Sequence, residues 1–440
     1  EWQRLTGAES AKTNRQLYGA PIHTSPVVVN YASTTTGDGG ARVPITDPAD
    51  QENLVFVSTN DGKLYAVDTE SGDEKLAFMP GEFLQPAAAG ASPRVAGLYD
   101  AARGDLPGPV LYGLDATWSA WRQDVNRDGN ITSSGSGDWV YLYGGMRRGG
   151  RNYYGLDVTA ANNTTPSMSQ LFVLQGGSAN SPFEDMGQTW SEPVLGLIRY
   201  NGDNVVVMVV AGGYDPAYDA GRPAGVPQGA QLYIVAAHNR GGANGISAGD
   251  VLWWASAEGI ATGNHQQIAA LTDSIPSTVK VLDKDGDGYI DHIYVGDLGG
   301  QIHRIDINKA NTGYNTLATS AVVAQLGTRG NATATAADDR RFYFPPSLAL
   351  MKDNLGRKHV ALAIGSGLLT SPRDTGVNEK FYYIRDYAPF GYSIAAADNL
   401  PYEYELGRES EKLLGSPLIV GGQVFFSTYY WGDNAVVANS

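Results

Sequence analysis

Two short patterns recur along this chain in the same order, and together they constrain its fold more than any single motif does. The first is a small or acidic residue followed by proline and an apolar segment. It occurs at residues 25–29, 92–95, 192–195, 345–348 and 416–419, with a looser copy at 275–279. The second is a strand ending in glycine, a short turn and an aromatic-x-apolar-Asp segment. It occurs at residues 55–68 and 293–306, with shorter copies at 154–157 and 383–386.

Each repeat is typical of one propeller blade, in which proline opens an inner strand and glycine allows tight turns between the next strands. Six openings are visible, and the interval 93–193 is long enough to hold another blade. We therefore expect an all-β, modified β-propeller of about seven blades, within a range of six to eight. An ordinary β-sandwich with similar turns is the alternative. Polar segments at 33–51, 162–168 and 328–338 are expected to be loop insertions, and residues 1–440 to form a single propeller domain.

Composition excludes several classes of function. The absence of cysteine rules out disulfides, thiolate zinc sites and c-type haem attachment. A net charge of -15 argues against binding nucleic acid or anionic lipid through the bulk surface. No apolar run is long enough for a transmembrane segment. The chain starts at Glu1 without a signal-like segment, so we expect a mature or excised part of a larger protein.

The segment 283–291, with sequence DKDGDGYID, has the spacing of a calcium loop. Acidic side chains alternate along it, glycine permits the sharp turn, and a backbone carbonyl faces inward two residues after the third carboxylate. The predicted ligands are Asp283, Asp285, Asp287, the carbonyl of Tyr289, and Asp291 as the closing carboxylate. The flanking segments 278–282 and 292–296 are rich in β-branched and aromatic residues, which predicts a β-hairpin. The alternative is an acidic surface turn without an ion.

A second segment, 124–132, repeats this spacing with only two carboxylates. Its candidate ligands are Asp124, Asn126, Asp128, Asn130 and Thr132. Arg127 adds a positive charge nearby, so any site here is expected to bind calcium more weakly. An Asn/Asp/Gly turn without metal is the alternative.

The run 137–158, with sequence GDWVYLYGGMRRGGRNYYGLDV, resembles a signature of the PilY/PilC family of type IV pilus tip-associated adhesin and biogenesis proteins. The first repeat, the 283–291 loop and the carboxy-terminal strands are also similar to that family, so the resemblance covers nearly the whole chain. It implies the C-terminal β-propeller domain of a larger protein. It further implies that calcium at the 283–291 loop regulates pilus extension against retraction, twitching motility and adhesion. The implied location is secreted or at the bacterial surface, at the pilus tip or outer membrane, with minor pilins as partners.

Three alternatives or additions remain open at this point. Arg103, Gly104 and Asp105 form a tripeptide that suggests binding to a host integrin receptor. Part of the repeat is similar to quinoprotein dehydrogenases, which bind pyrroloquinoline quinone, but the vicinal cysteine pair of those enzymes is missing. The six histidines are scattered and match no hydrolase motif, so we expect no enzyme. A purely structural, calcium-stabilised scaffold is the third alternative.

Overall fold

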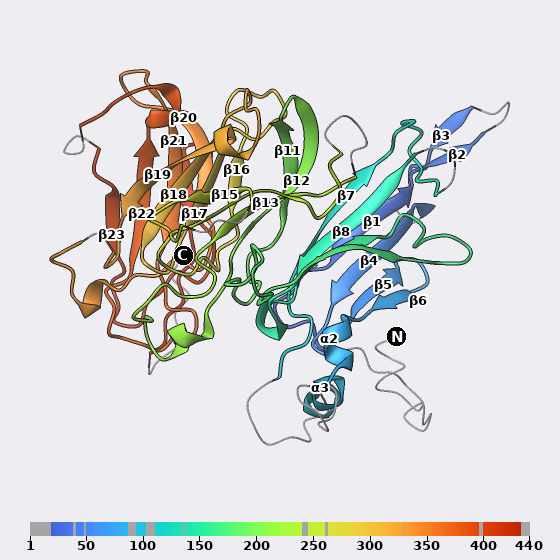
Figure 1. Cartoon of the computed structure of the whole chain (residues 1–440), viewed down its shortest axis with the longest axis horizontal. Coiled ribbons are helices and arrows are strands. Elements are labelled where there is room, and N and C mark those ends of the chain that lie inside the picture. Colours follow the sequence, from blue (N-terminus) through green and yellow to red (C-terminus); the bar gives the residue numbers. More distant parts are fainter. Residues whose placement is uncertain are drawn as a thin grey trace. The chain divides into compact units, whose positions relative to one another are not determined.

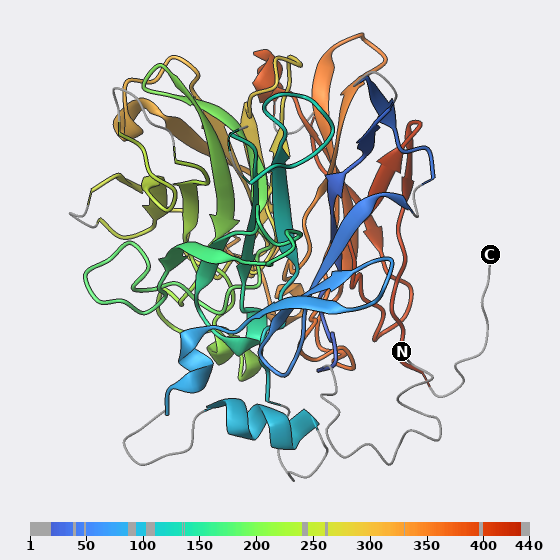
Figure 2. The same ribbon diagram turned by 90° about the vertical axis from the view of Figure 1, so that its right-hand side faces the viewer.

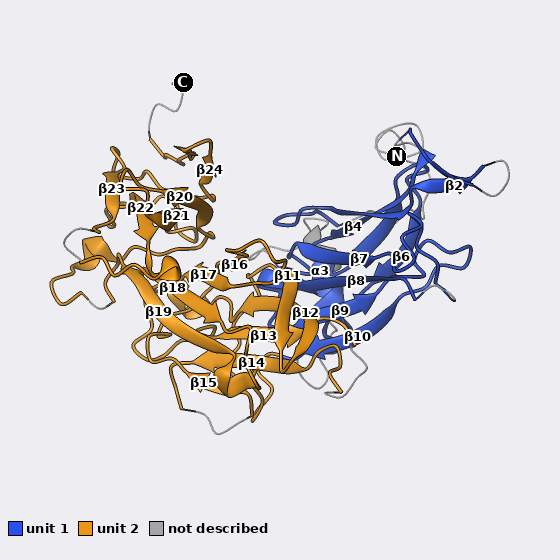
Figure 3. Ribbon diagram, turned by 90° about the horizontal axis from the view of Figure 1, so that it is seen from above, with its two compact units in different colours: residues 1–175 blue, residues 176–440 orange. Residues whose placement is uncertain are grey.

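Figure 1 shows a computed structural model of the chain. It describes residues 19–37, 41–47, 50–86, 94–102, 111–133, 135, 137–239, 245–259, 263–329, 331–395 and 399–432. The chain divides into two compact units, residues 1–175 and 176–440, which are coloured separately in Figure 3. The expected single domain over residues 1–440 stays a prediction.

In its described residues, unit 1 contains two four-stranded antiparallel sheets, in which each strand pairs with the next strand of the same sheet along the chain. The first, in the order β1-β4-β5-β6, consists of β1 (Val27–Ala32), β4 (Glu52–Ser58), β5 (Leu64–Asp68) and β6 (Glu74–Phe78). The second, in the order β10-β9-β8-β7, consists of β7 (Trp118–Gln123), β8 (Trp139–Gly145), β9 (Tyr153–Asp157) and β10 (Ser169–Leu174). The second sheet is the blade expected in the interval 93–193. A hairpin of β2 (Thr34–Thr36) and β3 (Arg42–Pro44) lies within the predicted 33–51 insertion.

A shared apolar core joins the two sheets of unit 1, because β-branched, leucine and aromatic side chains of both are buried together. Phe56, Leu142 and Trp118 are among the most buried of these residues. Gly144 is required here, since a Cβ atom at this position would overlap the indole ring of Trp118. The signature segment therefore contributes first of all to packing.

The prediction of a strand after Pro93 is wrong. The chain there forms helix α3 (Arg94–Ala102), preceded by the short helix α2 (Gly81–Leu84), and both lie at one end of the unit 1 strands (Figures 1 and 2). A proline before an apolar segment is as compatible with the first turn of a helix as with the start of a strand. Val95 and Leu98, three residues apart, lie on the same helix face, and Leu98 is buried.

The described part of unit 2 contains three larger sheets and one two-stranded sheet. The first sheet is β11 (Val194–Tyr200), β12 (Asp203–Ala211), β13 (Leu232–Ala236), β14 (Val251–Ser256) and the parallel edge strand β15 (His265–Gln267). The second is β16 (Lys280–Leu282), β17 (His292–Gly296), β18 (Gln301–Ile307) and β19 (Ala318–Gln325). The third is β20 (Ser347–Lys352), β21 (Lys358–Gly365), β22 (Lys380–Asp386) and β23 (Tyr402–Glu405). The last is β24 (Leu418–Val420) with β25 (Gln423–Phe425).

Short 3₁₀ turns connect several strands. They are η4 (Arg147–Gly149), η5 (Pro216–Asp219), η6 (Tyr314–Thr316), η7 (Ala336–Asp338) and η8 (Ala388–Phe390). Among the described residues no helix is both long and apolar enough to cross a membrane.

The proline-opened strands are confirmed at four positions, since β1, β11, β20 and β24 each begin directly after a proline. Within the described part of the chain, five sheets have four or five strands. Buried apolar clusters lie between successive sheets of unit 2, first β11–β15 with β16–β19, then β16–β19 with β20–β23. The all-β prediction is confirmed, whereas the number of seven blades stays a prediction.

Candidate metal centre

The segment 283–291 connects β16 and β17, which pair antiparallel with Leu282 opposite His292. The predicted hairpin is confirmed. Ile290 is 4% exposed within the core, and its backbone N–H donates to the carbonyl of Leu197 at 2.9 Å. The end of the loop is thereby fixed to the neighbouring sheet, while Asp285 and Asp287 are exposed to solvent.

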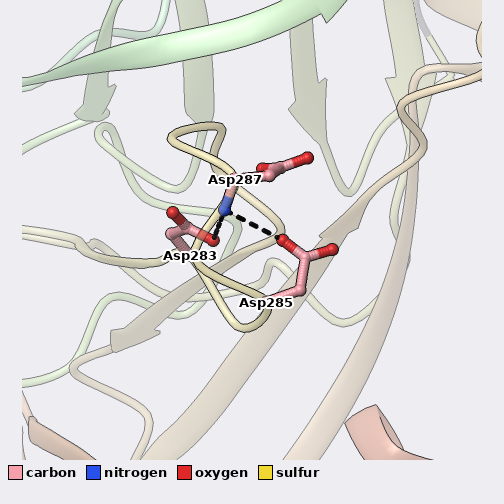
Figure 4. Close-up of side chains that lie close together, drawn as sticks. All are labelled: Asp283, Asp285 and Asp287. Atoms are coloured by element: carbon pink, nitrogen blue, oxygen red, sulfur yellow. Dashed lines mark hydrogen bonds between the residues drawn. The ribbon is translucent and has the colours of Figure 1, made fainter.

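Asp283 organises the turn by accepting backbone hydrogen bonds. Its Oδ1 accepts from Gly286 N at 2.7 Å and its Oδ2 from Gly288 N at 2.7 Å. Gly286 and Gly288 have φ angles of 79° and 88°, a region that glycine adopts without strain. The N–H of Asp287 points between the carboxylates of Asp283 and Asp285 (Figure 4). The sequence thus forms a tight loop whose backbone N–H groups point at the carboxylate of Asp283.

Three of the predicted ligands are close together. Asp283, Asp285 and Asp287 each place a carboxylate oxygen within 4.8 Å of the others. Asp291 lies outside this trio, and its Oδ2 accepts from Lys284 N at 2.7 Å. The backbone N–H of Tyr289 donates to Asp287 Oδ1 at 3.1 Å.

Lys309, which the sequence analysis missed, brings Asp291 together with the other carboxylates. Its Nζ lies 2.8 Å from Asp291 Oδ1, 2.8 Å from Asp287 Oδ2 and 3.1 Å from Asp285 Oδ1. Lys309 reaches the loop because β18 pairs with β17, and Ile307 N donates to Asp291 O at 2.8 Å. An ammonium group therefore occupies the point on which three acidic side chains converge.

Lys309 and the carboxylates of the loop each favour the charged form of the other. Burial acts to lower the pKa of Lys309, but hydrogen bonds to Asp287, Asp291 and Asp285 outweigh it and raise this pKa. The hydrogen bond from Lys309 is the main cause that lowers the pKa of Asp287. For Asp283, burial acts to raise the pKa, but N–H donors led by Gly288 lower it. Both carboxyl groups are therefore ionised at neutral pH and can act as oxygen ligands for a hard cation.

The second segment, 124–132, has the same backbone pattern but different side-chain partners. Asp124 accepts from Asp128 N and Gly129 N, as Asp283 does in the first loop. Asp128 Oδ2 pairs with Arg42 Nη2 at 3.0 Å, and Asn130 Oδ1 accepts from Thr34 N at 3.3 Å. Asn126 Nδ2 donates to Asp128 Oδ2 at 2.9 Å.

Asp138 takes the place in this second loop that Asp291 has in the first. Its Oδ1 accepts a hydrogen bond at 2.8 Å from the backbone N–H of Val125, which is the second residue of the loop. Its Oδ2 accepts one from Thr132 N at 3.1 Å. Thr132 is thus a donor to Asp138 in the structure. Calcium binding at this second loop stays a prediction. The tripeptide Arg103, Gly104 and Asp105 lies outside the described residues.

The arginines of the signature segment are engaged within unit 1. Arg147 Nη1 lies 3.2 Å from the buried carboxylate of Asp115, which also pairs with His23 Nδ1 at 2.8 Å. Arg148 lies over the ring of Tyr112, 5.4 Å from its centroid. Arg147 and Arg148 of the signature segment thus make contacts within unit 1 that stabilise the fold.

Residues 31–329 match the family model described as the PilY1 beta-propeller domain, a range that includes both loops. The type IV pilus biogenesis factor PilY1 of Pseudomonas aeruginosa (strain UCBPP-PA14) is 26% identical over 306 residues, or 67% of this chain and 21% of the relative. A PilY1 homolog of Xylella fastidiosa (strain Temecula1 / ATCC 700964) is 25% identical over 258 residues, or 58% of this chain and 14% of the relative. The chain therefore spans about a fifth of the length of the first relative and about a seventh of the second.

Among solved structures, the PilY1 C-terminal domain of Pseudomonas aeruginosa is similar, with a TM-score of 0.51 and 18% sequence identity. The match covers 86% of this chain and 76% of that chain. At this identity the likeness concerns the fold, and together with the family match it confirms the expected modified β-propeller.

Proposed function

Because this chain belongs to the PilY1 β-propeller family, we propose that it serves type IV pilus biogenesis as a non-enzymatic domain at the bacterial surface, regulated by calcium. The family match and the names of both curated relatives, which are pilus biogenesis factors, support this role. Those relatives are several times longer, so the pilus role of the whole protein is itself part of the proposal. In finer detail, we propose that calcium occupancy controls the extension of the pilus against its retraction. Through this it would regulate twitching motility and adhesion to surfaces or host cells.

The 283–291 loop fits calcium by the chemistry of its donors, since every candidate ligand is an oxygen. The residues that would hold the ion are Asp283, Asp285, Asp287, Asp291 and the carbonyl of Tyr289. Bound calcium would supply a hard dication that accepts six to eight such oxygens. The observation that carries this proposal is the position of Lys309, whose ammonium group contacts three of these carboxylates at once. The loop directs its negative charge to one point, as a cation site requires.

Lys309 also suggests how occupancy is communicated. The turn 308–317 between β18 and β19 is held against the loop by this lysine. When the carboxylates bind a metal ion, the ammonium group has to leave them, and the turn loses these three ion pairs. A partner that contacts the turn, such as a minor pilin, therefore binds the two forms with different affinities. This difference would bias the pilus between extension and retraction.

The test is Asp287→Asn in the full-length protein, expressed in the bacterium that encodes it. This change keeps the size of the side chain and removes one charge from the loop. Glu70→Gln, at an exposed turn of unit 1, is the matched control. Surface pili and twitching zones are measured with calcium and with a chelator.

Wild type and Glu70→Gln are expected to respond to calcium, and Asp287→Asn to give the same result in both conditions. If Asp287→Asn melts at a lower temperature but its pili still respond to calcium, the loop is a structural scaffold and the proposed regulation is wrong.

A further inference from the structure

A pocket lies in unit 2 on the β20–β23 sheet, and it is independent of the calcium proposal. Its volume is about 420 Å³. Its lining combines basic, aromatic and apolar side chains, among them Met351, His359, Tyr383, Arg385 and Tyr402. The pairing register of the strands, and the alternation of side chains between the two sheet faces, explain why these residues lie together. Met351 is opposite His359, and Tyr383 is opposite Tyr402, so all four side chains are on the same sheet face as Arg385.

Small residues continue this sheet face beside the pocket lining. Ala349 is opposite Ala361, which is opposite Arg385. Two alanines at the centre of a sheet face cannot fill the volume that larger side chains would occupy. Farther along the face, Ala363 is covered by the cluster that includes Leu413 and Ile419. The pocket is the part of the face that this cluster leaves open.

His359 is the most unusual residue of the pocket. It is 2% exposed, and neither ring nitrogen has a hydrogen-bond partner among the residues that the structure describes. Burial lowers its pKa, with the Arg357 backbone opposing the shift and Arg385 adding to it, so the ring is neutral at neutral pH. A neutral imidazole has one N–H donor, and leaving that donor unpaired when it is buried destabilises the protein. A ligand that accepts this hydrogen bond would recover that cost.

The pocket is basic on a strongly acidic chain. Arg385 and Lys352 line it, and neither side chain has an ion pair or hydrogen bond with any described residue. The one acidic lining residue, Asp353, is satisfied by other groups: Arg357 Nε at 2.8 Å and Tyr387 OH at 3.1 Å. With a net charge of -15 for the whole chain, two unpaired cations beside one pocket favour an anionic ligand.

We propose that this pocket binds a carboxylate group carried on an apolar peptide segment of a partner protein. The planar guanidinium of Arg385 matches a carboxylate in two parallel hydrogen bonds, and His359 supplies a further donor. Met351, Leu400 and Tyr402 give the pocket an apolar rim, which suits a peptide better than a bare inorganic anion. The partner is recognised by a chain-terminal or acidic side-chain carboxylate next to an apolar side chain.

The test uses the chain labelled with ¹³C-methyl methionine, because one of its six methionines lines the pocket. The probes are N-acetyl-Leu-Phe with a free carboxylate, the same dipeptide as the carboxamide, and inorganic phosphate. Arg385→Gln is the test variant. Lys358→Gln is the control, since it removes the same charge from an exposed position of the same sheet outside the pocket lining.

The free acid is expected to shift the Met351 methyl signal saturably and to leave the other five unchanged. The carboxamide and Arg385→Gln should each weaken this binding roughly tenfold or more, as the loss of a charge-assisted hydrogen bond does. Lys358→Gln should bind as wild type does, and unchanged signals from the other methionines in Arg385→Gln show that it is folded. Equal binding of acid and carboxamide, or no shift at Met351, overturns the proposal. A phosphate shift as strong as that of the acid overturns the peptide assignment.

Discussion

Replacing Lys309 by methionine should increase the affinity of the 283–291 loop for calcium. Lys309 holds three carboxylates that the proposed ion needs, so its ammonium group competes with calcium for them. Methionine keeps the length and the apolar stem of the side chain but removes the charge. The variant should therefore bind calcium more tightly and be less stable in chelator, because the carboxylates are left without a counter-charge.

The size of the effect follows from the least exposed of these ion pairs. Lys309 and Asp291 approach to 2.8 Å, with side chains that are 22% and 11% exposed. A pair of this kind contributes about 1 kcal/mol, which is about a fivefold change in a binding constant. The more exposed pairs with Asp285 and Asp287 act in the same direction but are screened by solvent and salt. A gain of at least about fivefold at low salt is expected.

Isothermal titration calorimetry in chelator-treated low-salt buffer measures this affinity directly. Lys358→Met is the matched control, because it removes one positive charge from an exposed position without an ion pair among the described residues. The reasoning is refuted if Lys309→Met binds calcium no better than Lys358→Met and wild type do.

Two further predictions concern stability. Backbone and side-chain donors led by the Arg357 N–H lower the pKa of Asp353 from 3.8 to about 2, against the effect of burial. Its carboxylate therefore stabilises the fold above pH 3.8 and loses this contribution as pH falls through about 2, so Asp353→Asn should melt below wild type at pH 6 but not at pH 2 by circular dichroism. Gly144→Ala should lower the free energy of unfolding of unit 1 by about 1–3 kcal/mol in urea titrations, because its Cβ overlaps Trp118; an unchanged midpoint would contradict the packing of the signature segment.

Much of the fold could be predicted from local patterns. Proline followed by an apolar segment located the starts of β1, β11, β20 and β24, and glycine turns located the hairpins between later strands. The same pattern failed at Pro93, because proline is compatible with two kinds of element and only tertiary packing of Leu98 selects the helix. The number of blades depends on how the sheets close, which local patterns do not encode.

The candidate site could be predicted in part, for a similar reason. The alternation of Asp283, Asp285 and Asp287 is local, so the sequence alone locates the loop. Lys309 and Asp138 could not be found in this way, since strand pairing brings them to their loops from a distance. His359 carried no sequence signal either, because its burial and its lack of a hydrogen-bond partner among the described residues depend on tertiary packing.

The most direct test of the central claim is a calorimetric calcium titration of the chain and of Asp287→Asn, each followed by a thermal melt with and without chelator. The account predicts that wild type binds one ion at this loop and melts at a higher temperature with calcium, and that Asp287→Asn loses both effects. Equal calcium binding by the two proteins would contradict the account, because the 283–291 loop would then not be the calcium site.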